Sequence, residues 1–244
     1  MNTLIIGQNR IDLNSVNSTN SYLLEYSSEE KIIEGTIVVT EEQIDGRGQR
    51  GNEWLSEPKK SLCMSILLYP KIDILHQFIL NKSVSLAVHS CLKRLGVLSL
   101  IKWPNDIFVK EKKIAGILIE NTIQNKTITK TIVGIGLNVN NESLIATATS
   151  LKNTLGVNVS LQIVISVLCE EIEKYYFLFK NNKDKVSSLY NENLFGKEEM
   201  TSFSQQGNTF EGVIKKVDDY GKLIVEVDGK NRLYSSGELS FNIF

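Results

Sequence analysis

Several features that would place the chain in a special class are scarce or missing. Its 244 residues include only three cysteines, Cys63, Cys91 and Cys169, an odd and widely spaced set that predicts neither a disulfide framework nor a zinc site. Each lies in an apolar run and is expected to be a small buried side chain. No run reaches the ~18 apolar residues that a membrane-spanning helix needs, and the N-terminus lacks a signal-peptide pattern. We therefore expect a cytoplasmic protein without a membrane partner.

An excess of charge of either sign is also absent. The chain has 27 Lys and Arg against 28 Asp and Glu, for a formal net charge of −1. This balance creates no global field for nucleic acid or anionic lipid, so a basic cluster that matters must be local. There is no internal repeat, and with 42% hydrophobic residues the chain can bury a substantial core. The length suits one large domain or a large domain plus a small one.

Hydrophobic patterning divides the chain near residue 196. Before it, apolar runs predict strands at 37–39, 62–68, 107–109, 114–119 and 128–139, and helical spacing predicts helices at 74–95 and 164–179. After it, short runs at 210–217, 223–227 and 232–234, with an Asp228-Gly229 hairpin turn, predict a β-meander. We expect an α+β fold in which a mixed-sheet domain over 1–196 is packed against a small barrel-like domain over 197–244.

A loop rich in glycine and arginine follows the first predicted strand. Its sequence is Gly46-Arg47-Gly48-Gln49-Arg50-Gly51-Asn52-Glu53-Trp54. The glycines allow close approach of the backbone to a ligand, and the cations and N–H groups suit an anionic oxygen. The indole of Trp54 offers a flat face for a purine. The alternatives are a solvated surface loop or an RNA-binding Arg-Gly segment. RNA binding is disfavoured because the motif occurs once, lies between two predicted strands and belongs to a chain that is not basic.

Three further motifs carry polar groups that chemistry could use. Lys102-Trp103-Pro104-Asn105-Asp106 places a lysine before a rigid turn, where a fixed cation can neutralise charge on a phosphate. Asn105 and Asp106 could equally cap that turn. Gly134-Ile135-Gly136-Leu137-Asn138-Val139-Asn140 has alternate glycines, which indicate either a close approach to the strand or a bulge. Ser18-Thr19-Asn20 is a helix N-cap, a ligand-binding triplet, or both.

In this order, and together with Lys113-Ile114-Ala115-Gly116-Ile117-Leu118-Ile119-Glu120, these motifs resemble the biotin–protein ligase family. The resemblance covers residues 18–140 and extends weakly to 237–240. It implies a catalytic domain like that of class II aminoacyl-tRNA synthetases and biotin ligases, followed by an SH3-like barrel. It also implies an ATP-dependent ligase that makes biotinyl-5′-AMP. The biotin would then pass to a lysine of a biotin carboxyl carrier protein, in acetyl-CoA carboxylase or a related carboxylase.

The resemblance also assigns roles to individual residues. The biotin-binding residues would be Ser18, Thr19, Asn20, Gln43, Arg47, Gly48, Gln49 and Lys102. The residues that bind ATP or the adenylate would be Arg50, Trp54, Lys102, Lys113 and Asn138. Lys102, Arg47 and Arg50 would be catalytic. Mg²⁺ would accompany ATP, and its ligands are not identified, since Asp106 and Glu120 are candidates by charge alone.

The chain departs from the family pattern at two positions of the loop. Gln49 and Asn52 stand where the family often has arginine. Because an amide carries no charge, we expect retention of the adenylate to depend more heavily on Arg47 and Arg50, and biotinyl-AMP to dissociate faster than from a ligase with arginine there.

Other functions can be weighed on the same residues. Only about seventeen residues precede Ser18, too few for the helix-turn-helix domain of some family members, so no DNA binding is expected. A lipoate ligase or acyltransferase would typically carry Arg-Arg-x-Ser-Gly-Gly-Gly, which the sequence lacks. A non-catalytic RNA-binding or adapter module is the rival of another class, and it predicts that Lys102 and Asn138 are dispensable. A homodimer is compatible with the sequence.

Overall fold

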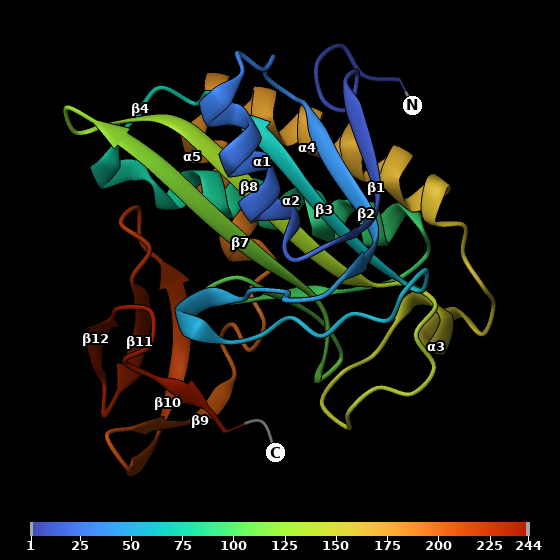
Figure 1. Cartoon of the computed structure of the whole chain (residues 1–244). Helices are drawn as coiled ribbons and strands as arrows, with labels where there is room; N and C mark the ends of the chain where they lie inside the picture. The colour runs from blue at the N-terminus through green and yellow to red at the C-terminus, as the bar shows by residue number, and fades with distance from the viewer. Residues whose placement is uncertain (1, 243–244) are drawn as a thin grey trace.

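The computed structural model describes residues 2–242, which form two β-sheets and a set of helices around the larger sheet (Figure 1). The larger sheet has the strand order β1-β2-β3-β8-β7-β6-β5, and β4 pairs with β8 outside that path. Its strands are β1 (Arg10–Val16), β2 (Ile37–Gln43), β3 (Ser61–Leu68), β4 (Ile72–Asp73), β5 (Leu100–Lys102), β6 (Asp106–Val109), β7 (Lys112–Gln124) and β8 (Thr127–Asn138).

The larger sheet is mixed. β1 and β2 run parallel, and the other neighbours run antiparallel. The helices are α1 (Thr19–Glu29), α2 (Phe78–Arg94), α3 (Leu151–Leu155), α4 (Leu161–Asn181) and α5 (Lys183–Glu192), with short 3₁₀ turns at Gln49–Gly51 and Ile74–His76. The prediction of an α+β fold with a mixed sheet is therefore confirmed.

Helices cover both faces of the larger sheet (Figure 1). α1 lies on one face, against β3 and β8, while α2 and α4 pack together on the other. Every residue of β3 is consequently buried. Side chains alternate along a strand, so Met64 and Ile66 join the main core, while Ser65 and Leu67 face α1. A polar side chain on the α1 face is thus buried beside the first turn of that helix.

The second sheet is antiparallel, with the order β12-β11-β10-β9-β13. Its strands are β9 (Met200–Gln205), β10 (Asn208–Val217), β11 (Leu223–Val227), β12 (Lys230–Tyr234) and β13 (Ser240–Phe241). The predicted Asp-Gly hairpin joins β11 to β12, with φ of 52° at Asp228 and 70° at Gly229. The turn between β10 and β11 inserts against the larger domain, where the indole N–H of Trp103 donates to the carbonyl of Gly221 at 2.9 Å.

Two simpler expectations can be checked on the same residues. All three cysteines are free and buried, which confirms that they are small core side chains. Among residues 2–242, no helix has the length and apolar character to cross a membrane.

Candidate active site

A cavity opens on the face of the larger sheet that carries α1, beside the N-terminus of that helix. The space between its walls is about 670 Å³, which includes open solvent at the mouth. β7 and β8 form the floor, and α1 and the segment between β2 and β3 form the walls. Because side chains alternate along a strand, Gly116, Leu118 and Glu120 of β7 share this face, as do Gly134 and Gly136 of β8.

The two glycines of β8 leave room for groups that lie on the floor. A Cβ atom at Gly134 would collide with the side chain of Asn20, and one at Gly136 would collide with the indole of Trp54. β8 pairs with β3 through both glycines without a register shift. The glycine motif therefore marks a close approach, as one of its two interpretations predicted, and not a bulge.

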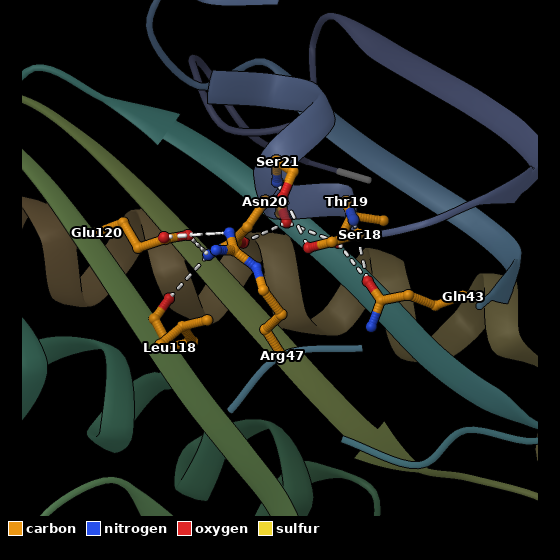
Figure 2. Close-up of polar contacts among 9 residues, drawn as sticks. Ser18, Thr19, Asn20, Ser21, Gln43, Arg47, Leu118 and Glu120 are labelled. Carbon is orange, nitrogen blue, oxygen red and sulfur yellow. Dashed lines mark hydrogen bonds and ion pairs between the residues drawn. The ribbon is translucent and has the colours of Figure 1, made fainter. Parts of the chain in front are cut away.

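The N-terminus of α1 supplies the polar end of the cavity (Figure 2). Ser18 is the N-cap, and its hydroxyl accepts a backbone hydrogen bond at 3.4 Å. Thr19 donates its backbone N–H to Oε1 of Gln43 at 2.9 Å, and Asn20 donates through Nδ2 to Glu120 at 2.8 Å. The triplet is both a helix cap and a wall of the cavity. Hydroxyl and amide groups, which can donate and accept hydrogen bonds without charge, dominate this end.

The Gly-Arg loop, residues 46–54 between β2 and β3, forms a second wall. Its two arms are joined by a backbone hydrogen bond of 2.8 Å from the N–H of Trp54 to the carbonyl of Gly46. Arg47 extends from one arm toward β7, and its Nη2 lies 3.1 Å from Oε1 of Glu120 (Figure 2). The loop is thus connected to the floor of the cavity by an ion pair.

The other end of the cavity combines an aromatic ring with a cation. The indole of Trp54 rests on Gly116 and Gly136, which are register partners in β7 and β8. The Nζ of Lys113 lies 5.6 Å from the centroid of the Trp54 ring and 2.6 Å from Oδ1 of Asp106. The side chain of Lys113 remains 35% exposed, so its ammonium is accessible to an anionic ligand.

Nine of the residues predicted for the site line this cavity. They are Ser18, Thr19, Asn20, Gln43, Arg47, Gly48, Gln49, Trp54 and Lys113. Three predicted residues, Lys102, Arg50 and Asn138, lie outside the lining. Most of the predicted binding residues are therefore brought together, whereas two of the three residues expected to be catalytic are separated from them.

Lys102 lies beside the cavity, between it and the second sheet, and its register partner Asp106 is one of the lining residues. Its Nζ is 5.3 Å from the ring centroid of Phe108 and 4.6 Å from that of Phe241. Burial lowers the pKa of Lys102, and the nearby carboxylate of Asp106 acts in the opposite direction. Aromatic faces thus hold this ammonium, and Lys113 is the lysine that reaches the cavity.

Arg50 and Asn138 also have partners elsewhere. Arg50 has a φ of 58° at the tip of the Gly-Arg loop, and its Nη2 donates to the carbonyl of Ser236, beyond β12. Asn138 is buried and donates through Nδ2 to the carbonyl of Thr149 at 3.0 Å. Arg50 therefore joins the loop to the C-terminal sheet, and Asn138 holds the segment that follows β8.

Sequence reasoning missed several residues at the cavity. Cys63 lies in the lining outside every motif of the sequence, and Glu53, Ile117 and Leu118 lie there within motifs but were assigned no role. Beneath the lining, the hydroxyl of Ser65 lies 2.6 Å from Oδ1 of Asn20 and 2.7 Å from the hydroxyl of Thr19. The signal that could have revealed Ser65 is a polar residue within an otherwise apolar strand, since a buried hydroxyl needs a partner.

The described residues do not form a resident metal site. No group of three or more metal-ligating side chains occurs in residues 2–242. The two carboxylates suggested by charge are both engaged, Asp106 with Lys113, and Glu120 with Arg47 and Asn20. A Mg²⁺ ion that arrives on the phosphates of a nucleotide needs no cage of protein ligands.

The cavity suits a ligand with a neutral polar head and an anionic tail. The hydroxyls and amides at the α1 end can satisfy the head, and Lys113 can neutralise the tail. The face of Trp54 beside Lys113 adds a surface on which a planar ring can stack.

Comparisons with known proteins agree with this geometry. Residues 13–138 match the model of the "Biotin/lipoate A/B protein ligase family", which is more than half of the chain. The chain belongs to this family. The match runs from within β1 to the end of β8, and so includes the floor and both walls of the cavity.

The relatives in this family are biotin ligases. The chain is 30% identical to the bifunctional ligase/repressor BirA of Bacillus spizizenii, over 97% of its own length and 75% of that protein. It is 26% identical to the biotin–[acetyl-CoA-carboxylase] ligase of Mycobacterium tuberculosis, over 91% and 85%. The solved biotin protein ligase of Aquifex aeolicus in complex with biotin and ATP superimposes with a TM-score of 0.81 at 25% identity, covering 96% of this chain and 99% of that one.

Proposed function

We propose that this chain is a biotin–protein ligase that activates biotin with ATP and transfers it to a lysine of a biotin carboxyl carrier protein. The observation that carries the proposal is the cavity itself, which joins the uncharged end at Ser18 and Thr19 to the cationic and aromatic end at Lys113 and Trp54. Biotin has a urea at one end and a carboxylate at the other, and ATP adds a purine and phosphates. The names of the relatives support acetyl-CoA carboxylase or a related carboxylase as the acceptor.

The α1 end of the cavity offers the groups that a urea requires. A urea has two N–H donors and one carbonyl acceptor, and it carries no charge. The Oε1 of Gln43 already accepts from Thr19, so the Nε2 of Gln43 is the group left to donate to the urea carbonyl. The hydroxyls of Ser18 and Thr19 can accept from its N–H groups. The dithiolane ring of lipoate makes no comparable demand, which favours biotin over the other substrate of the family.

The reaction follows from the chemistry of a carboxylate, which must be activated before an amine can attack it. An oxygen of the biotin carboxylate attacks the α-phosphorus of MgATP, and the bond to the β-phosphate breaks to release pyrophosphate. The acceptor lysine amine then attacks the acyl carbon of biotinyl-AMP, AMP leaves and the new amide loses a proton. Catalysis rests on positioning the reactants and neutralising developing charge.

We assign the main charge-neutralising role to Lys113. Its ammonium lines the cavity beside Trp54, whereas Lys102, the lysine expected from the sequence, lies between two aromatic rings. Lys102 keeps a secondary role in the proposal, as a cation close to Asp106 that contributes to the field at that end. Arg47 contributes as part of the wall.

Replacing each lysine by methionine tests the assignment, because methionine keeps most of the length and removes the charge. We expect Lys113→Met to lower the rate of pyrophosphate release from biotin and MgATP by about 100-fold, the typical cost of removing one donor to a developing oxyanion. Lys102→Met should lower the same rate by about threefold to tenfold. Exposed Lys112 is the matched control, and Lys112→Met should behave as wild type.

Several outcomes would overturn the proposal or its residue roles. A Lys113→Met variant with wild-type rates would remove that residue from the mechanism, and full activity of Lys102→Met would do the same for Lys102. Turnover with lipoate and not with biotin would replace the proposed substrate. Failure of the wild type to label a biotin-carrier domain in the presence of biotin and MgATP would reject the function.

Two finer expectations belong to the same proposal. The five strands of the second sheet support an SH3-like arrangement in the C-terminal domain, with residue 196 as its boundary. The net charge of −1 supports an enzyme without operator binding, since specific DNA contacts usually come with a basic surface.

A further inference from the structure

Glu120 stands out near the cavity because its role in the proposed reaction is not obvious. It lies on β7, on the face that carries Gly116 and Leu118 toward the cavity. Both carboxylate oxygens are engaged. Oε1 and Oε2 lie 3.1 Å and 3.2 Å from Nη2 of Arg47, and Oε2 also accepts from Nδ2 of Asn20 at 2.8 Å (Figure 2).

The contact with Arg47 connects the Gly-Arg loop to the sheet. Within residues 2–242, the Arg47–Glu120 contact is the one ion pair between residues 46–54 and another segment. All other ion pairs there involve residues outside the loop. The side chains of Arg47 and Glu120 are 42% and 28% exposed. A pair that is partly open to water is strong enough to bias a loop and weak enough to open for ligand entry.

The contact with Asn20 fixes the direction of a hydrogen-bond chain. An ionised carboxylate only accepts, so it requires the Nδ2 side of the Asn20 amide, which also faces the carbonyl of Leu118 at 3.4 Å. The Oδ1 of Asn20 must then accept from the hydroxyl of Ser65 at 2.6 Å. Ser65 has one proton, so once it donates to Asn20 it can only accept at its 2.7 Å contact with the hydroxyl of Thr19. The Thr19 hydroxyl has a second acceptor in Oε1 of Gln43, 3.2 Å away.

The direction of this chain determines what the cavity presents to a ligand. With its proton directed to Ser65 or to Oε1 of Gln43, the hydroxyl of Thr19 keeps a lone pair for an N–H of the ligand. The backbone N–H of Thr19 donates to Oε1 of Gln43, and the Nε2 of Gln43 is therefore left to donate to the ligand. Glu120 therefore sets a pattern of one acceptor and one donor, which is complementary to the N–H and C=O of a urea.

We propose that Glu120 is a positioning residue that latches the Gly-Arg loop through Arg47 and sets the hydrogen-bond polarity of the biotin head site through Asn20. The inference rests on the proposed function for the identity of the ligand. It gives Glu120, which was a Mg²⁺ candidate by charge alone, a role through the partners that both of its oxygens already have. Glu120 acts through Arg47 and Asn20 and makes no contact with the reacting atoms.

Glu120→Gln is the sharpest test, because glutamine has nearly the same shape and removes the charge. Its amide can accept from Asn20 or from Arg47, but its own N–H₂ must then face one of them. We expect the KM for biotin and the dissociation rate of biotinyl-AMP to rise about tenfold, with kcat for pyrophosphate release and the KM for ATP changed less than about threefold. Glu211→Gln, at an exposed position of the second sheet, is the control and should leave all four unchanged.

A second measurement needs no substrate and separates this inference from the proposed function. Amide hydrogen exchange across residues 46–54 of the ligand-free protein should be faster in Glu120→Gln than in the wild type and in Glu211→Gln. It should also accelerate in the wild type at about 1 M salt, where the partly exposed pair is screened. This salt arm remains informative if the variant does not fold.

The kinetic and exchange measurements distinguish failure of the latch, failure of the positioning role and failure of the proposed function. Unchanged loop exchange in the folded variant, or exchange in the wild type that is insensitive to salt, would overturn the latch. A kcat that falls while the KM for biotin stays constant would overturn the positioning role and make Glu120 part of the chemical step. A wild-type protein with no biotin-dependent pyrophosphate release would reject the proposed function, while the exchange result would still decide the latch.

Discussion

Arg47 and Arg50 are three residues apart in one loop, and their side chains point to different parts of the molecule. Arg47 pairs with Glu120 at the cavity, whereas Arg50 reaches the carbonyl of Ser236. The φ of 58° at Arg50 places it in the left-handed region, where the chain reverses direction at the tip of the loop. Gln49, immediately before the reversal, is left facing the cavity without a charge.

The charge at position 49 should govern how long the intermediate stays bound. We expect Gln49→Arg to slow the dissociation of biotinyl-AMP by about tenfold, because a guanidinium can form a charge-assisted hydrogen bond to the phosphate where an amide forms a neutral one. Release of labelled biotinyl-AMP into an excess of unlabelled intermediate measures the rate. Asn52→Arg, at the other departure from the family pattern, adds the same charge at a second position of the lining and tests whether location matters. Equal off-rates for Gln49→Arg and the wild type would contradict the prediction.

Residue chemistry could be predicted from the sequence, but residue orientation could not. The triplet at 18–20 and the Gly-Arg loop stood out because their residue types are typical of caps and turns, whereas Gln43 came only from the resemblance to the biotin–protein ligase family. Lys102 and Lys113 could not be distinguished in the same way, since each is a lysine at one end of a strand. The register of β6 against β7, which shifts between Ile107 and Phe108, brings Lys113 beside Gly116, whereas the ammonium of Lys102 packs against aromatic rings.

At the scale of elements, apolar periodicity predicted most of the long strands and helices that face the main core. It missed the short elements β4, β5, β9, β13 and α3, and it also missed β1 and α5. β1 lies at the edge of the larger sheet and alternates polar and apolar residues with none of them buried, so it contains no apolar run. α5 buries only Val186 and Tyr190. Elements at the margin of a core give a weak pattern because few of their positions must exclude water.

α2 shows a second limit of pattern reading, a lysine buried within a predicted helix. Lys82 has no exposed side-chain surface, and its Nζ lies 3.2 Å from the carbonyl of Val217 and 3.2 Å from the hydroxyl of Ser187. Burial lowers the pKa of Lys82, while the carboxylate of Asp219, 3.8 Å away, acts in the opposite direction. The amine thus connects α2 to the second sheet, but the burial of its charge costs stability.

Removing this charge should stabilise the fold in a pH-dependent way. We expect Lys82→Met to raise the free energy of unfolding by about 1 kcal/mol near neutral pH, since an apolar side chain of similar volume avoids the desolvation cost. Below its lowered pKa, Lys82 is protonated in both states and the full cost acts on the fold. Between that pKa and the ordinary value of 10.5, the unfolded chain binds more protons, so wild-type stability rises with pH and the advantage of methionine shrinks.

Urea unfolding near pH 7 and near pH 10 measures both parts of this prediction. Lys93→Met is the control, because Lys93 is exposed on the same helix and should change stability little at either pH. A Lys82→Met variant that is less stable than the wild type near neutral pH would show that the ammonium is a net stabiliser of the junction.

At the scale of the whole molecule, the second sheet packs against the larger domain and shares its hydrophobic core. Buried residues of both sheets form one continuous hydrophobic cluster, which runs from Ile37 and Met64 in the larger sheet to Val217 and Leu223 in the smaller. The β10–β11 turn and the contact of Arg50 with Ser236 join the two parts at separate places. Sequence patterning could predict a change of architecture near residue 196, but not this interlock, which depends on long-range contacts.

Gly221 provides a test of how far the two parts fold as one unit. It has a φ of 85°, and a Cβ atom there would collide with the ring of Phe78. We expect Gly221→Ala to cost roughly 2–3 kcal/mol, because it combines backbone strain with overpacking at the junction. Gly229→Ala is the matched control, since Gly229 has a φ of 70° and nothing within 4 Å of its Cβ position, and it should cost about 1 kcal/mol from the backbone alone.

Urea unfolding followed by tryptophan fluorescence and by far-UV circular dichroism gives the measurement, because Trp103 donates to the carbonyl of Gly221 and reports on the junction. The continuous cluster predicts a single transition with coincident probes for the wild type and Gly229→Ala. In Gly221→Ala, the fluorescence transition should move to a lower urea concentration. The circular dichroism transition should either move with it or follow at a higher urea concentration. Equal midpoints for the two alanine variants would mean that the contact with Phe78 does not hold the second sheet in place, and the two parts of the chain would then have to be treated as independently stable.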